Sequence, residues 1–399
     1  MDLVSPHPFW SLKNGLLHEY PSLHEDLRCE VVVLGAGISG ALVTHALVKA
    51  GRDVVVIDKR DVAGGSTSAS TALLQYEIDT HLVDLTRRLG RKDAEQAYRA
   101  CHTSIDMIER LVEEVGARFA FRRKSSVYLG TKPSDVAVLR KECDARQRAG
   151  IDVHFLDEQE IPKRFSFSRP AALVSSQAAE LDAHRLTHTL LANAVSHGAR
   201  VFDRTVVTHF EPGTRGVRLK TDDGYLIHAR HVVFATGYES QDFLPRRIVR
   251  LKSSFALASE TVRHFPGWWK QCLIWETARP YLYLRTAGDR ILVGGEDVPF
   301  RDPLRRDRLV EAKTKRLEQR FHQMFPHIEF RADHRWAGTF GETKDGLAYI
   351  GQIRQMPRCH FALGFGGNGI TYSAIAAEII CAALIGRRHP DAHLFSFDR

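Results

Sequence analysis

Apolar and polar residues follow one another along the chain in blocks that predict a mixed α/β protein. The first block begins at Val31 to Leu34, an apolar run typical of a strand buried on both faces. Ala41 to Ala50 holds no Gly or Pro and predicts a helix, which Gly51 ends. A second buried strand, Val54 to Ile57, ends on the acid Asp58. This order predicts a parallel βαβ unit.

Later blocks predict further helices and strands by their periods. Helical spacing of apolar residues covers two helices within 79–116, and then 134–150, 183–198, 306–325 and 370–385. Strands are expected at 119–129, 153–156, 201–210, 216–221, 225–229, 232–237, 250–260, 272–275, 281–285 and 290–294, and again at the start of 361–371. The segments 201–210, 216–221 and 225–229 predict a three-strand meander. Residues 1–28 are aperiodic and form a lead-in whose function is unreadable.

One predicted strand offers a candidate wall for a substrate pocket. Tyr281, Tyr283 and Arg285 share one face of it, and Leu282 and Leu284 share the other. The alternative, an amphipathic sheet surface beside solvent, stays open from the sequence alone.

Composition and charge narrow the function classes. The chain has 399 residues and a net charge of +8, but its basic residues are scattered among acids, which argues against a nucleic-acid partner. Its 6 cysteines form no CxxC pair and no metal-ligand spacing, so we expect reduced thiols in a cytoplasmic protein without a metal site. Neither a secretion signal nor a membrane-spanning run is indicated.

The turn after the first strand has the spacing of a dinucleotide-binding fingerprint. Gly35 permits a tight turn, Gly37 lets the backbone approach a pyrophosphate, and Gly40 lets the next helix pack closely. Asp58 is placed to accept hydrogen bonds from a ribose. Strand, helix and acid together make the motif specific, whereas GxGxxG alone is a weak signal.

Two other small-residue runs predict ligand contacts. The run from Gly64 to Ala72 offers hydroxyls and backbone donors for a second phosphate or a flavin, although Gly/Ser runs are also common in linkers. The run from Gly364 to Gly369 leads into an apolar helix, whose N-terminus would stabilise an anion such as the edge of a reduced flavin.

These motifs stand in an order that resembles the FAD-dependent D-amino acid oxidase superfamily, which includes glycine oxidase, sarcosine oxidase and γ-glutamylputrescine oxidoreductase. The resemblance rests on the glycine fingerprint, Ala235-Thr236-Gly237, Lys344-Asp345-Gly346-Leu347 and the loop from Gly364 to Gly369, and it covers about residues 29–386. Phe9-Trp10 in the lead-in looks most like the γ-glutamylputrescine oxidoreductase branch.

The resemblance implies a glutathione-reductase-type FAD-binding Rossmann domain and an antiparallel β-sheet substrate domain. The FAD domain is expected at 29–80, 170–245 and 338–399, and the substrate domain at 81–169 and 246–337. The implied FAD-binding residues are Gly35, Ala36, Gly37, Ile38, Ser39, Gly40, Asp58, Lys59, Gly65, Ser66, Thr67, Ser68, Ser70, Thr71, Val206 or Val207, Ala235, Thr236, Gly237, Gly366, Gly367, Asn368, Gly369, Ile370 and Thr371.

Three departures from the family bear on the substrate and the cofactor. Glycine and D-amino acid oxidases carry an Arg before the DG turn to pair the substrate carboxylate, and no Arg stands between Trp336 and Asp345 here. Sarcosine oxidases attach flavin through a Cys near this point, but Cys359 lies too far along, so non-covalent FAD is expected. They also place a Lys on the strand that reads Ile291 to Gly294 here, which leaves oxygen or another electron acceptor open.

The sequence therefore predicts an FAD-dependent enzyme that oxidises a C–N bond of an amine or amino acid by hydride transfer to flavin N5, with hydrolysis of the imine. The candidate catalytic and pocket residues are Tyr76, Trp275, Tyr283, Arg285, Trp336 and Lys344. Glu342 is either a partner for a second substrate amine or a surface acid. A 2-hydroxy acid dehydrogenase of the same superfamily and a non-catalytic FAD-binding subunit remain alternatives.

Overall fold

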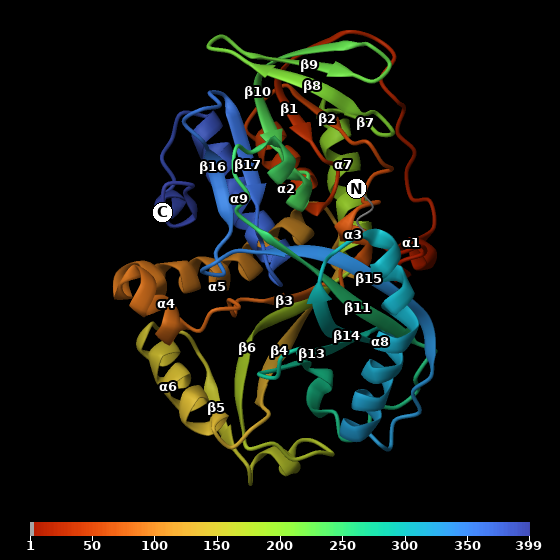
Figure 1. Cartoon of the computed structure of the whole chain (residues 1–399), viewed down its shortest axis with the longest axis vertical. Coiled ribbons are helices and arrows are strands. Elements are labelled where there is room, and N and C mark those ends of the chain that lie inside the picture. Colours follow the sequence, from red (N-terminus) through yellow and green to blue (C-terminus); the bar gives the residue numbers. More distant parts are fainter. Residues whose placement is uncertain (1–3) are drawn as a thin grey trace.

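The computed structural model describes residues 4–399, apart from the side chain of residue 119, and contains two β-sheets that lie one above the other (Figure 1). The first sheet occupies the upper half of Figure 1 and the second the lower half. Residues 1–3 of the predicted lead-in lie outside the described residues.

The first sheet has the strand order β16-β17-β10-β1-β2-β7. Its strands are β1 (Leu27–Leu34), β2 (Val54–Ile57), β7 (Arg200–Phe202), β10 (Leu226–Phe234), β16 (Tyr349–Gln352) and β17 (Cys359–Leu363). All neighbours are parallel except β16 and β17, so the strands from β7 to β17 end at one edge. Residues 54–57 are fully buried Val and Ile, as expected for a strand covered on both faces.

Helices and a meander cover the two faces of this sheet. On one side α2 (Ile38–Lys49) packs between α7 (Ala183–Ser196) and α9 (Gly369–Leu384), and α5 (Arg91–Glu114) packs on α9. On the other side β8 (Val207–Pro212) and β9 (Val217–Thr221) extend β10 as an antiparallel meander.

The second sheet has the order β15-β11-β14-β13-β12-β4-β6-β3, with β5 paired to β6. Its strands are β3 (Leu73–Gln75), β4 (Phe121–Gly130), β5 (His154–Asp157), β6 (Ala171–Leu181), β11 (Arg250–Ser259), β12 (Leu273–Glu276), β13 (Leu282–Ala287), β14 (Arg290–Pro299) and β15 (Ala332–Glu342). Its neighbours are antiparallel except β4 and β12.

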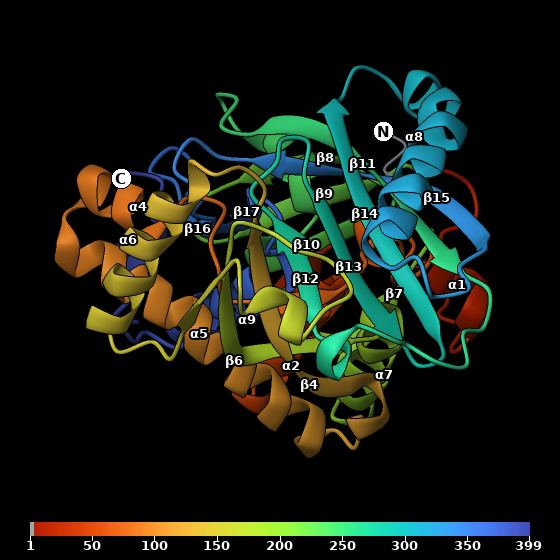
Figure 2. The same ribbon diagram turned by 90° about the horizontal axis from the view of Figure 1, so that it is seen from below.

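Helices flank the second sheet at opposite ends (Figure 2). The helix α8 (Pro303–Met324) lies at one end, and α4 (Leu82–Leu89), α5 and α6 (Asp135–Arg148) lie at the other. Leu282 and Leu284 join α8 residues such as Leu317 in one hydrophobic cluster, whereas Tyr281 and Tyr283 face a cavity. The expected alternation of β13 is therefore confirmed.

Two predicted strands differ from the structure. Residues 201–210 form β7 and β8 rather than one strand, because Arg204 takes a left-handed φ of 45° and the amide of Thr205 donates to the carbonyl of Asp58. The break lets β7 join the first sheet while β8 starts the meander. Residues 225–229 and 232–237 were expected as separate strands, but β10 is continuous, because it pairs with β1 from Ile227 to Phe234.

Other differences concern boundaries. The helix expected from Ala41 begins at Ile38, inside the glycine fingerprint, and α8 begins at Pro303 because Asp302 caps it by accepting from the amide of Arg305. Strand β15 runs through the domain boundary expected at 337/338 and pairs with β11 along its length. The division into discontinuous domains stays a prediction.

Candidate active site

A cavity of about 430 Å³ lies between the carboxyl edge of the first sheet and one face of the second. Its lining falls into two groups of residues. One end is formed by the ends of β1, β2 and β10 with 205–207 and 237–243, and the other by 73–79, Trp275, Tyr281, Tyr283 and 338–341. The helix α3 (Ser66–Ala69) and the loop 364–370 line it between them. We call the end formed by β1, β2, β10, 205–207 and 237–243 the nucleotide end, and the end formed by 73–79, the three aromatic residues and 338–341 the substrate end.

The glycine fingerprint forms a turn whose neighbours leave no room for side chains. Gly35 has φ 105°, and a Cβ there would lie 2.5 Å from the carbonyl oxygen of Ala235. A Cβ on Gly40 would lie 1.8 Å from the carbonyl oxygen of Gly35, so α2 packs directly on the turn. The expected tight turn and close helix packing are confirmed.

Asp58 lies at the mouth of this turn and lines the cavity. Its Oδ2 accepts from the amide of Ala36 at 2.6 Å and its Oδ1 from the amide of Arg60 at 2.9 Å. Burial raises the pKa of Asp58 above its usual value, against the effect of these two donors. The side chain of Lys59 forms an ion pair with Glu239 at 2.9 Å, and Arg60 pairs with the same carboxylate.

Two tryptophans fix the hydroxyl-rich segment in the cavity wall. The indole nitrogen of Trp336 donates to the carbonyl of Ala69 at 2.8 Å, and that of Trp10 donates to the next carbonyl, Ser70, at 2.6 Å. At the other end of α3, Thr67 Oγ1 accepts from the amide of Ile38 at 3.0 Å. A positioning role for Trp10 was not predicted, because an aromatic pair in an aperiodic segment carries no sign of its partners.

These features fit a dinucleotide cofactor. The first amides of α2 and α9 have no acceptor inside their helices, and both helices begin at residues that line the cavity; in α2 the amide of Ile38 donates to Thr67 Oγ1. The collision distances at Gly35 and Gly40 keep backbone, rather than side chains, at the turn. An acidic group at the end of β2 completes the arrangement expected for an adenosine ribose.

Most predicted cofactor residues line the cavity, and four lie just behind it. Those in the wall are Gly35, Gly37, Ile38, Ser39, Asp58, Lys59, Gly65, Ser66, Thr67, Ser70, Thr71, Val206, Val207, Ala235, Thr236, Gly237, Gly366, Gly367, Asn368, Gly369 and Ile370. Behind the wall lie Ala36, Gly40, Ser68 and Thr371. Of these, Thr371 Oγ1 donates to the carbonyl of Asn368 and Ser68 Oγ to that of Gly65.

The candidate catalytic residues divide into two groups. Trp275, Tyr283 and Trp336 line the cavity, as expected, but Tyr76, Arg285 and Lys344 do not. Arg285 is 3% exposed, and its Nη1 donates to the carbonyls of Ala72 at 2.7 Å and Leu181 at 2.9 Å. Its guanidinium therefore joins β13 to the segment after α3 and cannot receive a substrate carboxylate.

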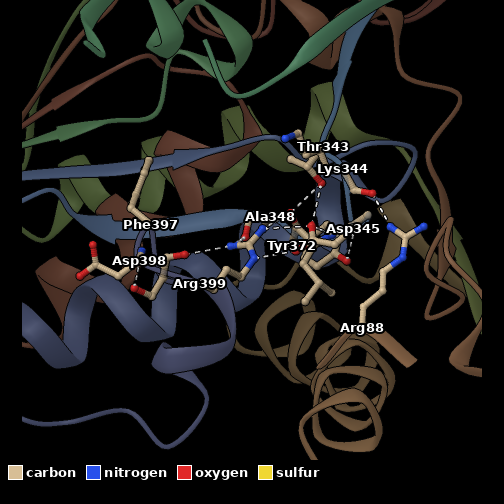
Figure 3. A network of polar contacts seen from close by, with 12 residues as sticks. Arg88, Thr343, Lys344, Asp345, Ala348, Tyr372, Phe397, Asp398 and Arg399 are labelled. Carbon is tan, nitrogen blue, oxygen red and sulfur yellow. Dashed lines mark hydrogen bonds and ion pairs between the residues drawn. The ribbon is translucent and has the colours of Figure 1, made fainter. Parts of the chain in front are cut away.

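Lys344 lies in an exposed turn that serves the structure (Figure 3). Its carbonyl accepts from Arg88, and its neighbour Asp345 pairs with Arg399 Nε at 2.9 Å. Arg399 also donates to the carbonyl of Leu347 at 2.7 Å, and Tyr372 of α9 donates to that of Gly346 at 2.8 Å. The turn is thus tied to α9 and to the C-terminal segment, and the Lys344 side chain lies outside the cavity wall.

Tyr76 points away from the cavity because the extended segment around it alternates. Leu73, Gln75, Glu77 and Asp79 line the cavity, whereas Tyr76 is 0% exposed and packs its ring 5.4 Å from that of His102 on α5. Glu77 and Asp79 were missed. The polar residues at a two-residue spacing, Gln75, Glu77 and Asp79, were the available signal.

The two missed acids adjoin the glycine loop that precedes α9. The Glu77 carbonyl accepts from Asn368 Nδ2 at 2.6 Å, and Asp79 Oδ2 accepts from the amide of Gly367 at 3.2 Å. The Glu77 side chain is buried, and its Oε2 has no hydrogen-bond partner among the described residues. Burial raises the pKa of both carboxyls, although Arg146 opposes the shift at Glu77.

Aromatic rings complete the substrate end. Tyr281 and Tyr283 lie 5.6 Å apart, Tyr283 Oη is hydrogen-bonded to Ser254 Oγ at 3.1 Å, and Trp275 stacks on Tyr128 at 3.8 Å. Phe340 lines the cavity in the segment where the resemblance expected an Arg. Among the described residues, the cations in the wall are Lys59 and Arg60, both at the nucleotide end. Glu342 forms an ion pair with Lys252 at 2.8 Å.

No helix in 4–399 is both long and apolar enough to cross a membrane. The same residues contain no cluster of three or more His, Cys, Asp or Glu side chains suited to a metal ion.

Comparisons with known proteins agree with the expected fold. The family described as "FAD dependent oxidoreductase" (DAO) matches residues 30–383. The γ-glutamylputrescine oxidoreductase of Escherichia coli (strain K12) is 22% identical over 380 residues, 92% of this chain and 85% of that protein. The crystal structure of L-proline dehydrogenase from P. horikoshii has a TM-score of 0.78 at 20% identity and covers 94% of this chain and 97% of that one. Glycine oxidase from Geobacillus kaustophilus has a TM-score of 0.76 at 21% identity, with 93% and 99% covered.

Proposed function

Because this chain belongs to the family of FAD-dependent oxidoreductases, we propose that it oxidises a C–N bond of a cationic amine rather than of a free α-amino acid. The observation that carries the proposal is the charge of the substrate end. Glu77 and Asp79 line that end with Trp275, Tyr281 and Tyr283, and the cations of the described wall stand at the other end. Carboxylates and aromatic faces both attract an alkylammonium ion.

In this proposal the cofactor runs along the cavity from the nucleotide end to the substrate end. The turn at Gly35 to Gly40 and the start of α2 hold the pyrophosphate, Asp58 accepts from the ribose, and the loop 366–370 meets the flavin ring. FAD supplies the hydride acceptor, and the protein supplies position and electrostatics. No cysteine among residues 4–399 lines the cavity, which supports non-covalent FAD that acid precipitation would release.

The missing cation argues against an α-amino acid or a 2-hydroxy acid. Either substrate brings a carboxylate, which would lie in the same end as Glu77 and Asp79 with no Arg in the described wall to pair it. Arg279 lies outside this wall, with its guanidinium 5.0 Å from the ring of Tyr281. A buried charge without a partner costs on the order of several kcal/mol. Two of the similar proteins, glycine oxidase and L-proline dehydrogenase, are named for amino acids, and γ-glutamylputrescine oxidoreductase is named for an amine. The names of these proteins are therefore compatible with either class of substrate.

Anaerobic reduction of the bound flavin tests the proposal directly. Butylamine, N-methylbutylamine and putrescine would be compared with glycine, D-alanine and L-proline by stopped-flow absorbance. We expect at least one amine to bleach the flavin with a second-order rate constant at least about tenfold above that of any of the amino acids. Faster reduction by an amino acid than by every amine would overturn it.

A further inference from the structure

Glu77 is a buried acid in the cavity wall that the family resemblance does not assign. We infer that Glu77 accepts the proton that a substrate ammonium must lose before its C–N bond is oxidised. This inference rests on the proposed function and names a catalytic group within the same site.

The proton step follows from the chemistry of amine oxidation. An alkylammonium ion has no lone pair, so the new C=N bond cannot form while its nitrogen is fully protonated. The ammonium N–H bond breaks, its proton forms an O–H bond with the Glu77 carboxylate, and the electron pair stays on nitrogen. FAD, when bound, would supply the acceptor for the hydride of the neutral amine's α-C–H bond, and water would hydrolyse the iminium product.

Glu77 is better placed for this step than Asp79. The two acids lie on the same side of one extended segment, but Asp79 Oδ2 already accepts from the amide of Gly367. Glu77 is 4% exposed, and its Oε2 is buried without a hydrogen-bond partner in the described part of the chain. Its own carbonyl is held by Asn368 of the glycine loop, which fixes the backbone beside the expected flavin.

One buried cation, Arg146, interacts electrostatically with two carboxylates, Glu142 and Glu77. On α6, Arg146 and Glu142 are both 0% exposed and are joined through Nε and Oε1 at 2.8 Å. Glu142 also accepts from the amides of Leu82 at 2.8 Å and Val83 at 3.1 Å. Arg146 thus makes its ion pair with Glu142. Its charge also favours the ionised form of Glu77, without an ion pair to that residue.

The pKa values of Glu142 and Glu77 are therefore shifted in opposite directions. Burial works to raise the pKa of Glu142, but Arg146, His81 and the two amides outweigh it and leave that pKa below its usual value. At Glu77 burial outweighs Arg146 and raises the pKa. A carboxyl whose ionisation is moved toward neutral pH is suited to take a proton and release it again. In the described part of the chain, the phenols of Tyr76 and Tyr98 also interact with the charge of Glu77, and the carboxyl of Asp79 belongs to the same end of the cavity.

The first test compares pH profiles of flavin reduction in the holoenzyme. With an amine that reduces the wild-type flavin, Glu77→Gln should slow reduction on the order of 10²-fold near neutral pH. The loss should shrink as the pH approaches the amine's own pKa, because the solution then supplies neutral amine. Glu77→Asp should retain part of the neutral-pH rate. A loss that stays constant with pH, or no loss, would overturn the inference.

The second test does not depend on turnover. The probes are tert-butylamine, which has no α-C–H bond and cannot be oxidised, and tetramethylammonium, which has no N–H proton. Calorimetry in two buffers of different ionisation enthalpy counts the protons released when each cation binds to the holoenzyme. Below the Glu77 pKa, wild type should release close to one proton with either probe, and Glu77→Gln should release none.

Asp297→Asn is the matched control, because Asp297 is a second acid near Tyr281 whose pKa is also raised by burial, to about 6. Proton release that survives Glu77→Gln and disappears in Asp297→Asn would overturn the inference. The two proposals fail separately, since a flavin that no amine reduces contradicts the proposed function, while the calorimetry still reports on Glu77.

Discussion

The two ends of the cavity are built from different parts of the polypeptide. At the nucleotide end the wall is largely backbone, with glycines where a Cβ would collide, and the cations Lys59 and Arg60 are paired with Glu239. At the substrate end the wall consists of side chains from the 73–79 segment and from the second sheet. In the proposed function, the first construction would bind a ligand with a pyrophosphate, whereas the second would select a substrate by its charge.

The largest effect is expected where the backbone itself is the binding surface. Gly37→Val should abolish FAD binding, because even a Cβ at Gly37 lies 3.0 Å from Thr67 Oγ1 and a branched side chain would also displace the pyrophosphate. The flavin-to-protein absorbance ratio of the purified protein measures the loss. Thr103→Ala, on the exposed side of α5, is the control, and full flavin absorbance in Gly37→Val would contradict the assignment.

Phe340→Arg should reverse the charge preference of the substrate end while leaving the nucleotide end intact. A guanidinium there would pair an amino acid carboxylate and repel an alkylammonium ion, so we expect about a tenfold or larger change in the ratio of the two reduction rates. Phe340→Leu keeps the wall apolar and should leave the ratio near that of wild type. An unchanged ratio in Phe340→Arg would mean that substrates bind away from this strand.

Trp10→Phe tests whether FAD binding at the nucleotide end depends on the N-terminal lead-in, residues 1–28. The change removes the donor to the carbonyl of Ser70, and an unpaired buried carbonyl costs about 1–3 kcal/mol. We expect weaker FAD binding, measured by titration of apoprotein, with no change in the preference among amines. A shift in amine preference with unchanged FAD affinity would contradict the division between the two ends.

Asp345→Asn is expected to have the smallest effect and a characteristic pH dependence. Burial opposes ionisation of Asp345, but Arg399 and nearby donors outweigh it and hold its pKa below the usual value. A lowered pKa contributes stability above the unfolded-state pKa, and that stability is lost as the pH falls through the folded-state pKa. The variant should lose about 1–3 kcal/mol of unfolding free energy near pH 7. Urea unfolding should give converging stabilities at acid pH, and a pH-independent difference would contradict this account.

The difference between the nucleotide end and the substrate end also explains how much of the site could be predicted from the sequence. Backbone sites demand glycine at fixed spacings, so the sequence alone located Gly35, Gly40, Asp58 and the loop from Gly366. The substrate end depends on which face of an extended segment meets the cavity. There the sequence pointed to Tyr76 instead of Glu77, a shift of one residue that reverses the side chain's direction.

Arg285 shows a second limit of sequence reasoning. Its position on the cavity-facing side of β13 was predicted, but its guanidinium is used by backbone carbonyls of segments more than 100 residues away. Such partners have no local pattern in the sequence. The same applies to the pairing of Glu142 with Arg146, where an i,i+4 spacing suggests a surface pair and the structure buries both.

The two indole hydrogen bonds at the C-terminal end of α3 also constrain the order in which parts of the chain come together during folding. Ala69 and Ser70 are held by residues 336 and 10, so the segment that completes the nucleotide end reaches its final position only after distant parts of the chain have met. Contacts of such long sequence separation form slowly, because loop closure is paid for before they stabilise anything. Cofactor loading is therefore expected late in folding, and protease cleavage between residues 60 and 72 should be fast in refolding intermediates and slow once FAD is bound.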